Sequence, residues 1–269
     1  MNFLTQIPIG QFIPGSSFVH RLDPRAKLLF VVFFVGIVFW AKEPATYGLL
    51  IGFVLLSIVV SGISPGYLLR SLRAIIWIIL FTVIIHLFMT KGGEVWYTWK
   101  WIEIHEEGVK QAISIALRLI LLILMASLLT LTTSPIDLTD GIERLFSPLA
   151  RFGFPAHELA MMMSIALRFI PTLIEETDKI MKAQISRGAD FESGNLLKRV
   201  KNMVPLLIPL FISAFRRAEE LALAMESRGY RGAIGRTKLR ELTWTRLDLV
   251  LLGIAISLVL AFFILKSWG

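Results

Sequence analysis

The sequence predicts an all-α, polytopic integral membrane protein with about five transmembrane helices and a cytoplasmic domain of two long crossed helices plus a short one. Of its 269 residues, 55% are hydrophobic and only 18% are charged, which is not the composition of a soluble globular domain. Several apolar runs approach the roughly 20 residues that a helix needs to cross a bilayer. Two further helical stretches begin apolar and end charged, which is typical of helices that pass from a hydrophobic environment into water.

Five apolar runs are the predicted membrane spans. They occupy residues 28–40, 46–61, 74–89, 111–132 and 248–265. Lys27 extends the first span backward if its long side chain snorkels to the membrane surface. The connection at 90–110 is polar, and its aromatic residues between Trp96 and Trp101 are placed as an interfacial belt would be.

Basic residues in the short loops orient these spans. The segment before the first span carries two arginines and a lysine against one aspartate, and Arg70 and Arg73 precede the third span. In the connection 90–110, three lysines face four glutamates. Because cytoplasmic loops are enriched in Lys and Arg, we expect the N-terminus inside the cell and the 90–110 connection outside. After the fifth span, the C-terminus then lies outside.

The segment between the fourth and fifth spans is predicted to be cytoplasmic. A short amphipathic helix occupies 136–152, and two helices of about 33 residues, each roughly 50 Å long, occupy 154–187 and 196–228. Both long helices contain internal prolines, which are expected to kink them. The predicted domains are a membrane domain of four spans at 1–133, a cytoplasmic helical domain at 134–240 and a last transmembrane helix at 241–269.

Both long helices end in the same tripeptide. Ser186-Arg187-Gly188 closes the first and Ser227-Arg228-Gly229 closes the second, a shift of 227 − 186 = 41 residues. A glycine just past a helix can adopt the left-handed conformation that ends it, which places each arginine at a helix C-terminus. One interpretation is that each arginine caps its own helix, where cations are favoured. The other is that two matched guanidinium forks on one surface bind the carboxylates of a two-fold partner.

Three further motifs accompany the paired Arg-Gly endings: ESRGY at 226–230, ALRFIP at 166–171, and IPG followed by HRLDPR within 13–25. Together, in this order and spacing, they resemble the transmembrane coupling subunit, or T component, of energy-coupling factor (ECF) transporters, a branch of the ABC importers. The resemblance covers nearly the whole chain. The family motif is Ala-Arg-Gly, and serine replaces alanine in both copies here. Since alanine and serine are both small, we expect that the exchange does not prevent the arginines from docking on a partner protein.

The resemblance implies a non-catalytic subunit of an ATP-driven importer for a vitamin or another micronutrient. Two cytosolic ABC-type ATPases, identical or different, would each accept one arginine, Arg187 or Arg228, in a groove with acidic side chains. A small substrate-binding membrane protein, the S component, would pack beside the chain. ATP-driven closure of the ATPase pair would move the two coupling helices and tilt the S component.

The apolar beginnings of the two long helices are the expected contact with the S component. The residues are Met161, Met162 and Met163 in the first helix and Leu206 and Leu210 in the second. Unbranched thioethers repack easily, so a methionine surface suits the exchange of different partners. The plain alternative is that these side chains face the protein core or lipid.

The chain carries no pattern typical of a catalytic or metal centre. Its four histidines lie in different segments without metal-ligand spacing, and it has no cysteine. A G-x-x-x-x-G-K-[ST] run, which would bind ATP, is also missing. We therefore expect no metal, no cofactor, no nucleic acid and no ATP hydrolysis by the chain itself. Arg168, in an apolar stretch, is expected to pair with a helix-end carbonyl or an acidic neighbour.

Two other function classes stay open at this point. A membrane-embedded enzyme, such as a lipid-phosphate transferase, would need clustered carboxylates for a divalent ion, and Asp137, Asp140 and Glu143 are the close acidic set. Their spacing also fits the first turns of a helix, where acidic residues are favoured. A secondary transporter would show inverted repeats and charged or broken spans. The repeat in this chain is direct.

Overall fold

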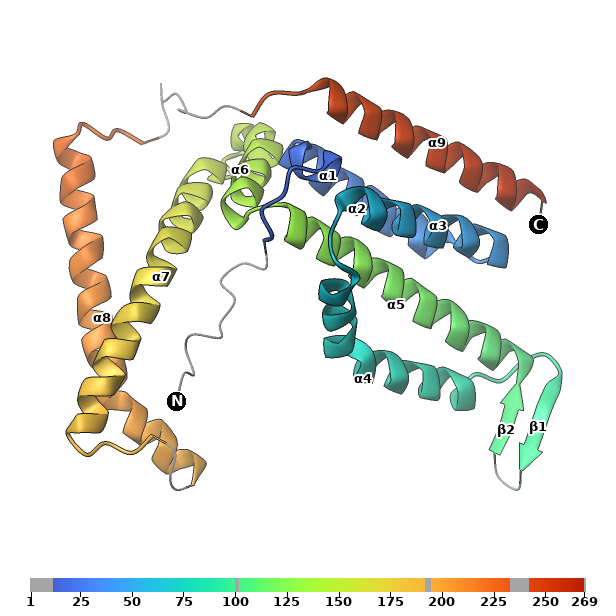
Figure 1. The fold of residues 1–269 in the computed structure, drawn as a ribbon, viewed down its shortest axis with the longest axis horizontal. Helices are drawn as coiled ribbons and strands as arrows, with labels where there is room; N and C mark the ends of the chain where they lie inside the picture. Colours follow the sequence, from blue (N-terminus) through green and yellow to red (C-terminus); the bar gives the residue numbers. More distant parts are fainter. Residues whose placement is uncertain (1–11, 100–101, 192–194, 233–241, 269) are drawn as a thin grey trace. The chain divides into compact units, whose positions relative to one another are not determined.

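A computed structural model describes residues 12–99, 102–191, 195–232 and 242–268. These residues are almost entirely helical, which confirms the all-α prediction (Figure 1). The helices are α1 (Phe18–Arg21), α2 (Pro24–Trp40), α3 (Pro44–Ser61), α4 (Pro65–Met89), α5 (Glu106–Thr132), α6 (Pro135–Phe146), the short 3-10 helix η1 (Ser147–Phe152), α7 (Ala156–Ser186), α8 (Leu196–Ser227) and α9 (Arg246–Trp268).

The connection between α4 and α5 contains an antiparallel hairpin that the sequence analysis did not predict. Strand β1 (Val95–Trp99) pairs with β2 (Ile102–His105). Aromatic and β-branched residues dominate both strands, and such residues favour a pleated surface. Trp96 is exposed, as an interfacial aromatic residue would be. Trp101, which belongs to the predicted belt, lies outside the described residues.

Five helices of the described chain are long and apolar enough to cross a membrane, which confirms the predicted number. They are α3, α4, α5, α7 and α9. The predicted first span, α2, is not among these five; it has 17 residues, about 26 Å at the rise of an α-helix. Helix α7 is the least apolar of the five, with a mean hydropathy of 1.3 in its best window against 2.0 to 2.7 in the others. Its predicted cytoplasmic location stays a prediction.

Proline residues begin several helices, and one of these helices begins earlier than the predicted span. Pro44 and Pro65 stand at the first helical positions of α3 and α4, where a missing N–H is harmless. Helix α4 therefore begins nine residues before the predicted span at Ala74, and Arg70 and Arg73 lie inside it. The predicted place of these two arginines before the membrane-spanning part of the helix stays a prediction.

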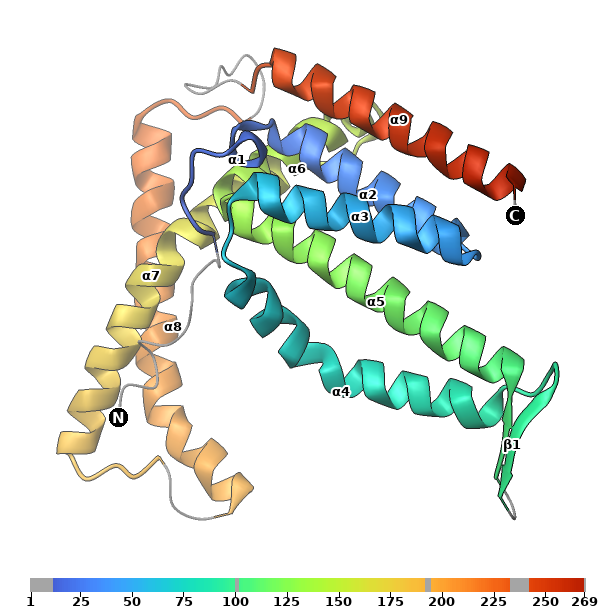
Figure 2. The same cartoon turned by 45° about the vertical axis from the view of Figure 1, so that its right-hand side comes forward.

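The described residues divide into two compact units, one containing 12–142 and 242–268 and the other lying within 143–232. In the first unit, α2, α3, α5 and α9 share one hydrophobic core, whose largest buried members include Phe34, Leu50, Val54 and Leu121. Helix α4 lies along α5, and the hairpin lies at their far ends (Figures 1 and 2). The predicted domain limits stay a prediction, and the limit at 240/241 lies outside the described residues.

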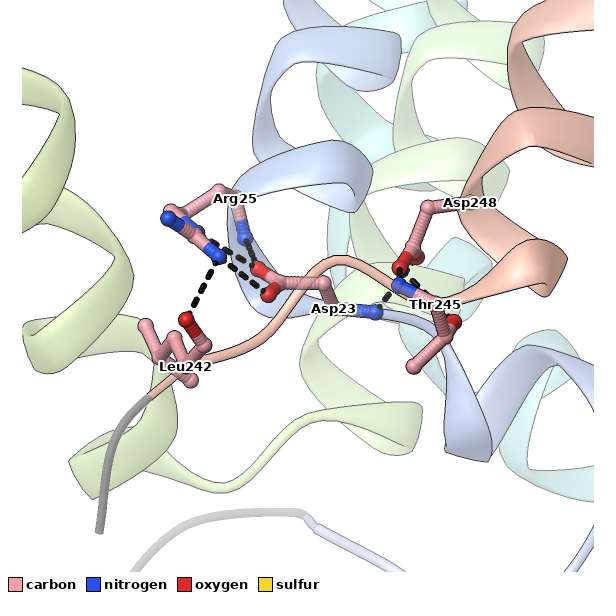
Figure 3. A network of polar contacts seen from close by, with 5 residues as sticks. All are labelled: Asp23, Arg25, Leu242, Thr245 and Asp248. Carbon is pink, nitrogen blue, oxygen red and sulfur yellow. Dashed lines mark hydrogen bonds and ion pairs between the residues drawn. The ribbon is translucent and has the colours of Figure 1, made fainter.

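A buried polar network joins the start of α2 to the start of α9 (Figure 3). The carboxylate of Asp23 accepts the backbone N–H of Arg25 at 2.8 Å and pairs with its guanidinium at 2.8 Å. The same guanidinium donates to the carbonyl of Leu242 at 3.0 Å. Asp248 accepts the N–H of Asp23 at 2.9 Å and both the N–H and the hydroxyl of Thr245, at 2.7 and 2.8 Å. The N-terminal motif thus fixes the last helix.

Lys27 does not snorkel. Its ammonium group is buried and donates to the carbonyl of Thr132 and the hydroxyl of Thr133, both at 3.0 Å. These acceptors belong to the C-terminal end of α5, where unpaired carbonyls and the helix dipole favour a cation. The lysine thereby ties the beginning of α2 to the end of α5.

The second unit contains the two long helices, and both continue through their prolines. Pro171 lies inside α7, and Pro205 and Pro209 lie inside α8. Figure 2 shows α8 bending along its N-terminal part, where its two prolines lie. The predicted short helix at 136–152 is split into α6 and η1, because Pro148 interrupts the regular hydrogen bonds.

Candidate functional site

Helix α7 ends in a complete Schellman motif around Arg187. Gly188 is left-handed, with φ = 86°. Its N–H donates to the carbonyl of Ile185 at 2.9 Å, and the N–H of Ala189 donates to the carbonyl of Gln184 at 3.0 Å. These are the two hydrogen bonds that define this type of helix ending. Arg187 is consequently the last residue before the chain turns away.

Helix α8 repeats this geometry around Arg228. Gly229 is left-handed, with φ = 72°. Its N–H donates to the carbonyl of Glu226 at 2.9 Å, and the N–H of Tyr230 donates to the carbonyl of Met225 at 3.0 Å. Every bond is the counterpart of one at the α7 end, 41 residues earlier. The predicted left-handed glycines are therefore present at both ends.

Neither arginine caps its own helix with its side chain. Within the described part of the chain, the guanidinium groups of Arg187 and Arg228 are exposed and make no hydrogen bond or ion pair. The neighbouring serines turn inward instead, since the hydroxyl of Ser186 donates to the carbonyl of Lys182 and that of Ser227 to the carbonyl of Ala224, both at 3.0 Å. Two strong, forked donors are thus left available at the helix ends.

The two helices cross in opposite directions (Figure 1). At the crossing, Phe169 and Leu173 of α7 face Ala214 and Ala218 of α8. Small residues let two helices approach closely, as the alanine spacing predicts. Beside them, Arg217 donates to Glu176 at 2.6 Å, and both side chains are half-buried. This ion pair joins the two helices.

Because the helices run in opposite directions, the two arginine ends lie at opposite ends of the crossed pair (Figure 1). The sequence analysis predicted two forks on one surface, and that common surface stays a prediction. An opposed arrangement still suits a two-fold partner, provided that the partner offers one acidic groove at each end.

The residues expected to contact the S component differ in exposure. Met162 and Met163 are more than half exposed, whereas Met161 is half-buried. Leu206 and Leu210 are both half-buried as well.

The exposed apolar stripe of α8 lies next to Leu206 and Leu210. It consists of Leu207, Phe211 and Phe215, which are 47%, 62% and 74% exposed. The sequence analysis missed these three residues, although their spacing of four already indicates one helix face. Which face of α8 points outward depends on how α8 packs on α7, and the sequence does not reveal that packing.

The acidic set considered for an enzyme has structural partners. Asp137 donates its N–H to the hydroxyl of Ser134 at 3.1 Å and accepts that hydroxyl at 2.7 Å, which is a cap for α6. Glu143 pairs with His157 at 2.9 Å. Across the described ranges, no group of three or more His, Cys, Asp or Glu residues is arranged to hold a metal ion.

Arg168 does not meet the expectation stated for it. It is exposed and has no hydrogen-bond or ion-pair partner among the residues that the structure describes. Arg168 lines the same groove as Arg228, which stands at the end of α8.

Comparisons with known proteins agree with the motifs. Residues 15–239 match the family model of CbiQ, cobalt transport protein. The energy-coupling factor transporter transmembrane protein EcfT of Brevibacillus brevis is 58% identical over 257 residues, which is 96% of this chain and 97% of the relative. The proteins of the same name from Acidaminococcus fermentans and Bacillus subtilis are 56% and 52% identical, over 99% and 95% of this chain and over 98% and 97% of their own lengths.

The matched region contains both arginine ends and the whole of α7 and α8. With five apolar helices and relatives that are named transmembrane proteins, the chain is a multi-pass membrane protein. The resemblance stated from the motifs is confirmed. The chain belongs to the family of the CbiQ cobalt transport protein and of the EcfT transmembrane proteins of energy-coupling factor transporters.

Proposed function

We propose that this chain is the transmembrane subunit that links ATP binding and hydrolysis by two cytosolic ABC-type ATPases to reorientation of a substrate-binding S component. The transported compound would be a vitamin or another micronutrient. Family membership supports the assignment, since the relatives are named energy-coupling factor transporter transmembrane proteins. The chain itself would be non-catalytic, with ATP hydrolysis carried out by the other subunits.

The observation that carries the proposal is the pair of matched helix ends. Arg187 and Arg228 stand at the tips of two long helices, in the same backbone motif, with unpartnered guanidinium groups among the described residues. Arginine forks match carboxylates in two parallel hydrogen bonds. Each tip would therefore dock into an acidic groove of one ATPase, with the adjacent serine and glycine keeping the tip narrow.

The exposed apolar face of the crossed helices would hold the S component. Met161, Met162 and Met163 would contribute from α7, with Leu206 and Leu210 beneath the exposed stripe of α8. Large exposed apolar patches mark protein or membrane contacts. In a bilayer, such a face suits a membrane-embedded partner, and its flexible methionines suit partners of different shape.

The lengths of α7 and α8 suggest how motion is transmitted. They have 31 and 32 residues, about 46 and 48 Å at the rise of an α-helix. Closure of an ATPase dimer would displace the two tips relative to each other. Because the Glu176–Arg217 ion pair and the alanine contacts hold the crossing, the displacement would rotate the helices and tilt the protein that rests on them.

Membrane orientation follows from the same assignment. The tips must reach cytosolic ATPases, so residues 143–232 would lie at the cytoplasmic side with the N-terminus. The C-terminus after α9 would then lie outside, in agreement with the distribution of basic residues.

Co-purification tests the assignment. The full-length chain, tagged and extracted from its native membrane in a mild detergent, should carry along proteins with an ATP-binding phosphate loop and a small polytopic membrane protein, which mass spectrometry identifies. An intact chain that repeatedly purifies without any ATPase would contradict the proposal.

The helix ends give a first prediction. Gly188→Val should weaken ATPase retention and uptake, because a left-handed residue other than glycine costs about 1–2 kcal/mol and branched residues are the least tolerated. Apart from the two chain neighbours, no atom of the described residues lies within 4 Å of the position that a Cβ would take, so the expected effect is one of backbone conformation. Gly188→Asn is the matched control, since asparagine tolerates this conformation. Equal retention in the two variants would contradict the role of the cap.

A further inference from the structure

A groove of about 650 Å³ lies beside the Arg228 end, between the first half of α7 and the last turns of α8. Met161 and Met225 line it, and so do three arginines. Arg168 comes from α7, Arg228 stands at the end of α8, and Arg231 follows the left-handed glycine. Helix α7, the end of α8 and the residues after α8 thus bring three guanidinium groups to one groove.

These three charges are not neutralised within the described part of the chain. Arg168, Arg228 and Arg231 are all exposed, and none makes a hydrogen bond or an ion pair there. The described residues that line the groove include no carboxylate. Glu226, two residues before Arg228, is exposed but does not line the groove. The charge of the groove is therefore suited to binding an anionic ligand.

The internal repeat provides a comparison with the other helix end. Under the shift of 41 residues, Arg231 corresponds to Asp190, since 231 − 190 = 41, and Arg168 corresponds to Pro209, since 209 − 168 = 41. At the end of α7, Arg187 is therefore followed by the negatively charged Asp190, whereas the corresponding position at the end of α8 holds the positively charged Arg231. The backbone motif is duplicated, but the charge around it is not.

The shape and position of the groove favour separate carboxylates over one compact anion. Its arginines come from α7, from the end of α8 and from the residues that follow α8. Three arginines from different segments can each pair with a different carboxylate in a forked arrangement. The methionines between them can accommodate apolar side chains of the same ligand.

We propose that Arg168, Arg228 and Arg231 together bind an acidic segment of one ATPase subunit, with at least two carboxylates in that segment. This inference rests on the proposed docking of Arg228 to an ATPase and adds two residues to it. It also makes the two helix ends unequal. The Arg228 end takes the more acidic of the two docking surfaces, and its binding is the more sensitive to salt.

The test uses the full-length chain in nanodiscs and measures the Kd of the purified ATPase pair at low and high salt. Arg168→Gln and Arg231→Gln should each weaken binding about tenfold at low salt, the loss expected for one charge-assisted contact. The difference from the unaltered chain should shrink at about 0.5 M salt, because screening weakens exposed ion pairs. Arg216→Gln, at an exposed arginine of α8 that does not line the groove, is the matched control and should change Kd less than twofold.

The outcomes separate this inference from the proposed function. If Arg168→Gln and Arg231→Gln bind the ATPases like the unaltered chain while Arg228→Glu does not, the three-arginine groove is wrong and docking stands. If Arg228→Glu also binds normally, docking through Arg228 is wrong, and with it the inference that rests on it. The nanodiscs are prepared with zwitterionic lipid alone and with added anionic lipid. A loss that appears only with anionic lipid would assign the groove to a lipid headgroup and overturn the inference.

Discussion

Replacing Arg187 and Arg228 together by glutamate is expected to separate the chain from its ATPases and to abolish ATP-driven uptake. Each guanidinium is exposed and has no partner among the described residues, so its loss should remove the proposed contact with an ATPase without disturbing the fold. A hydrogen bond to a charged group contributes about 1.5–3 kcal/mol, which is about 10- to 150-fold in affinity per end. Charge reversal adds repulsion from the acidic groove.

The single variants and one control make this prediction specific. Arg187→Glu and Arg228→Glu should each weaken ATPase binding, and the double variant should combine both losses because the ends lie far apart on the crossed helices. Arg216→Glu, at an exposed arginine of α8 away from the end, should bind normally. ATPase binding in detergent and uptake into whole cells are the measurements. Normal binding by the double variant would rule out docking through the arginines.

Asp23→Ala is expected to destabilise the membrane unit strongly. The change leaves Arg25 buried without its carboxylate, and it removes the cap of α2. Breaking a buried ion pair by removing one partner typically costs about 3–5 kcal/mol. Because the guanidinium of Arg25 also donates to the carbonyl of Leu242, just before α9, losing the carboxylate that orients it should loosen α9 from the bundle. The expected result is a Tm in detergent well below that of the unaltered chain at the same heating rate.

A second variant shows whether the loss comes from the ion pair. Thr245→Val removes one hydroxyl bond to Asp248 and leaves its other two hydrogen bonds in place, so a loss of only about 1 kcal/mol is expected. If Asp23→Ala and Thr245→Val lower Tm by the same small amount, the network does not hold α9 in the way described.

The sequence predicts those features that depend on local chemistry. The left-handed residues at Gly188 and Gly229 are found as predicted, because a glycine after a run of helix formers ends a helix whatever surrounds it. The long apolar runs likewise predict membrane helices, since a helix satisfies its own backbone hydrogen bonds in lipid.

Features that depend on distant residues could not be predicted. The bond between the backbone of Asp23 and the side chain of Asp248 joins residues 225 positions apart. The spacing of the tripeptides reveals a repeat but not the antiparallel crossing that sends Arg187 and Arg228 to opposite ends. The exposed stripe of α8 was missed for the same reason, because its outward face is set by the packing of α8 on α7.

The most direct test of docking at the helix ends uses cysteine cross-linking in native membranes. The chain contains no cysteine, so Ser186→Cys and Ser227→Cys each introduce one unique thiol beside an arginine, at an exposed position. With a short thiol-to-amine reagent, both variants should cross-link to ATPase subunits, whereas Phe215→Cys on the apolar stripe should cross-link to a small membrane protein instead. Thiols at 186 and 227 that never reach an ATPase, and that react only with lipid-soluble reagents, would contradict the account.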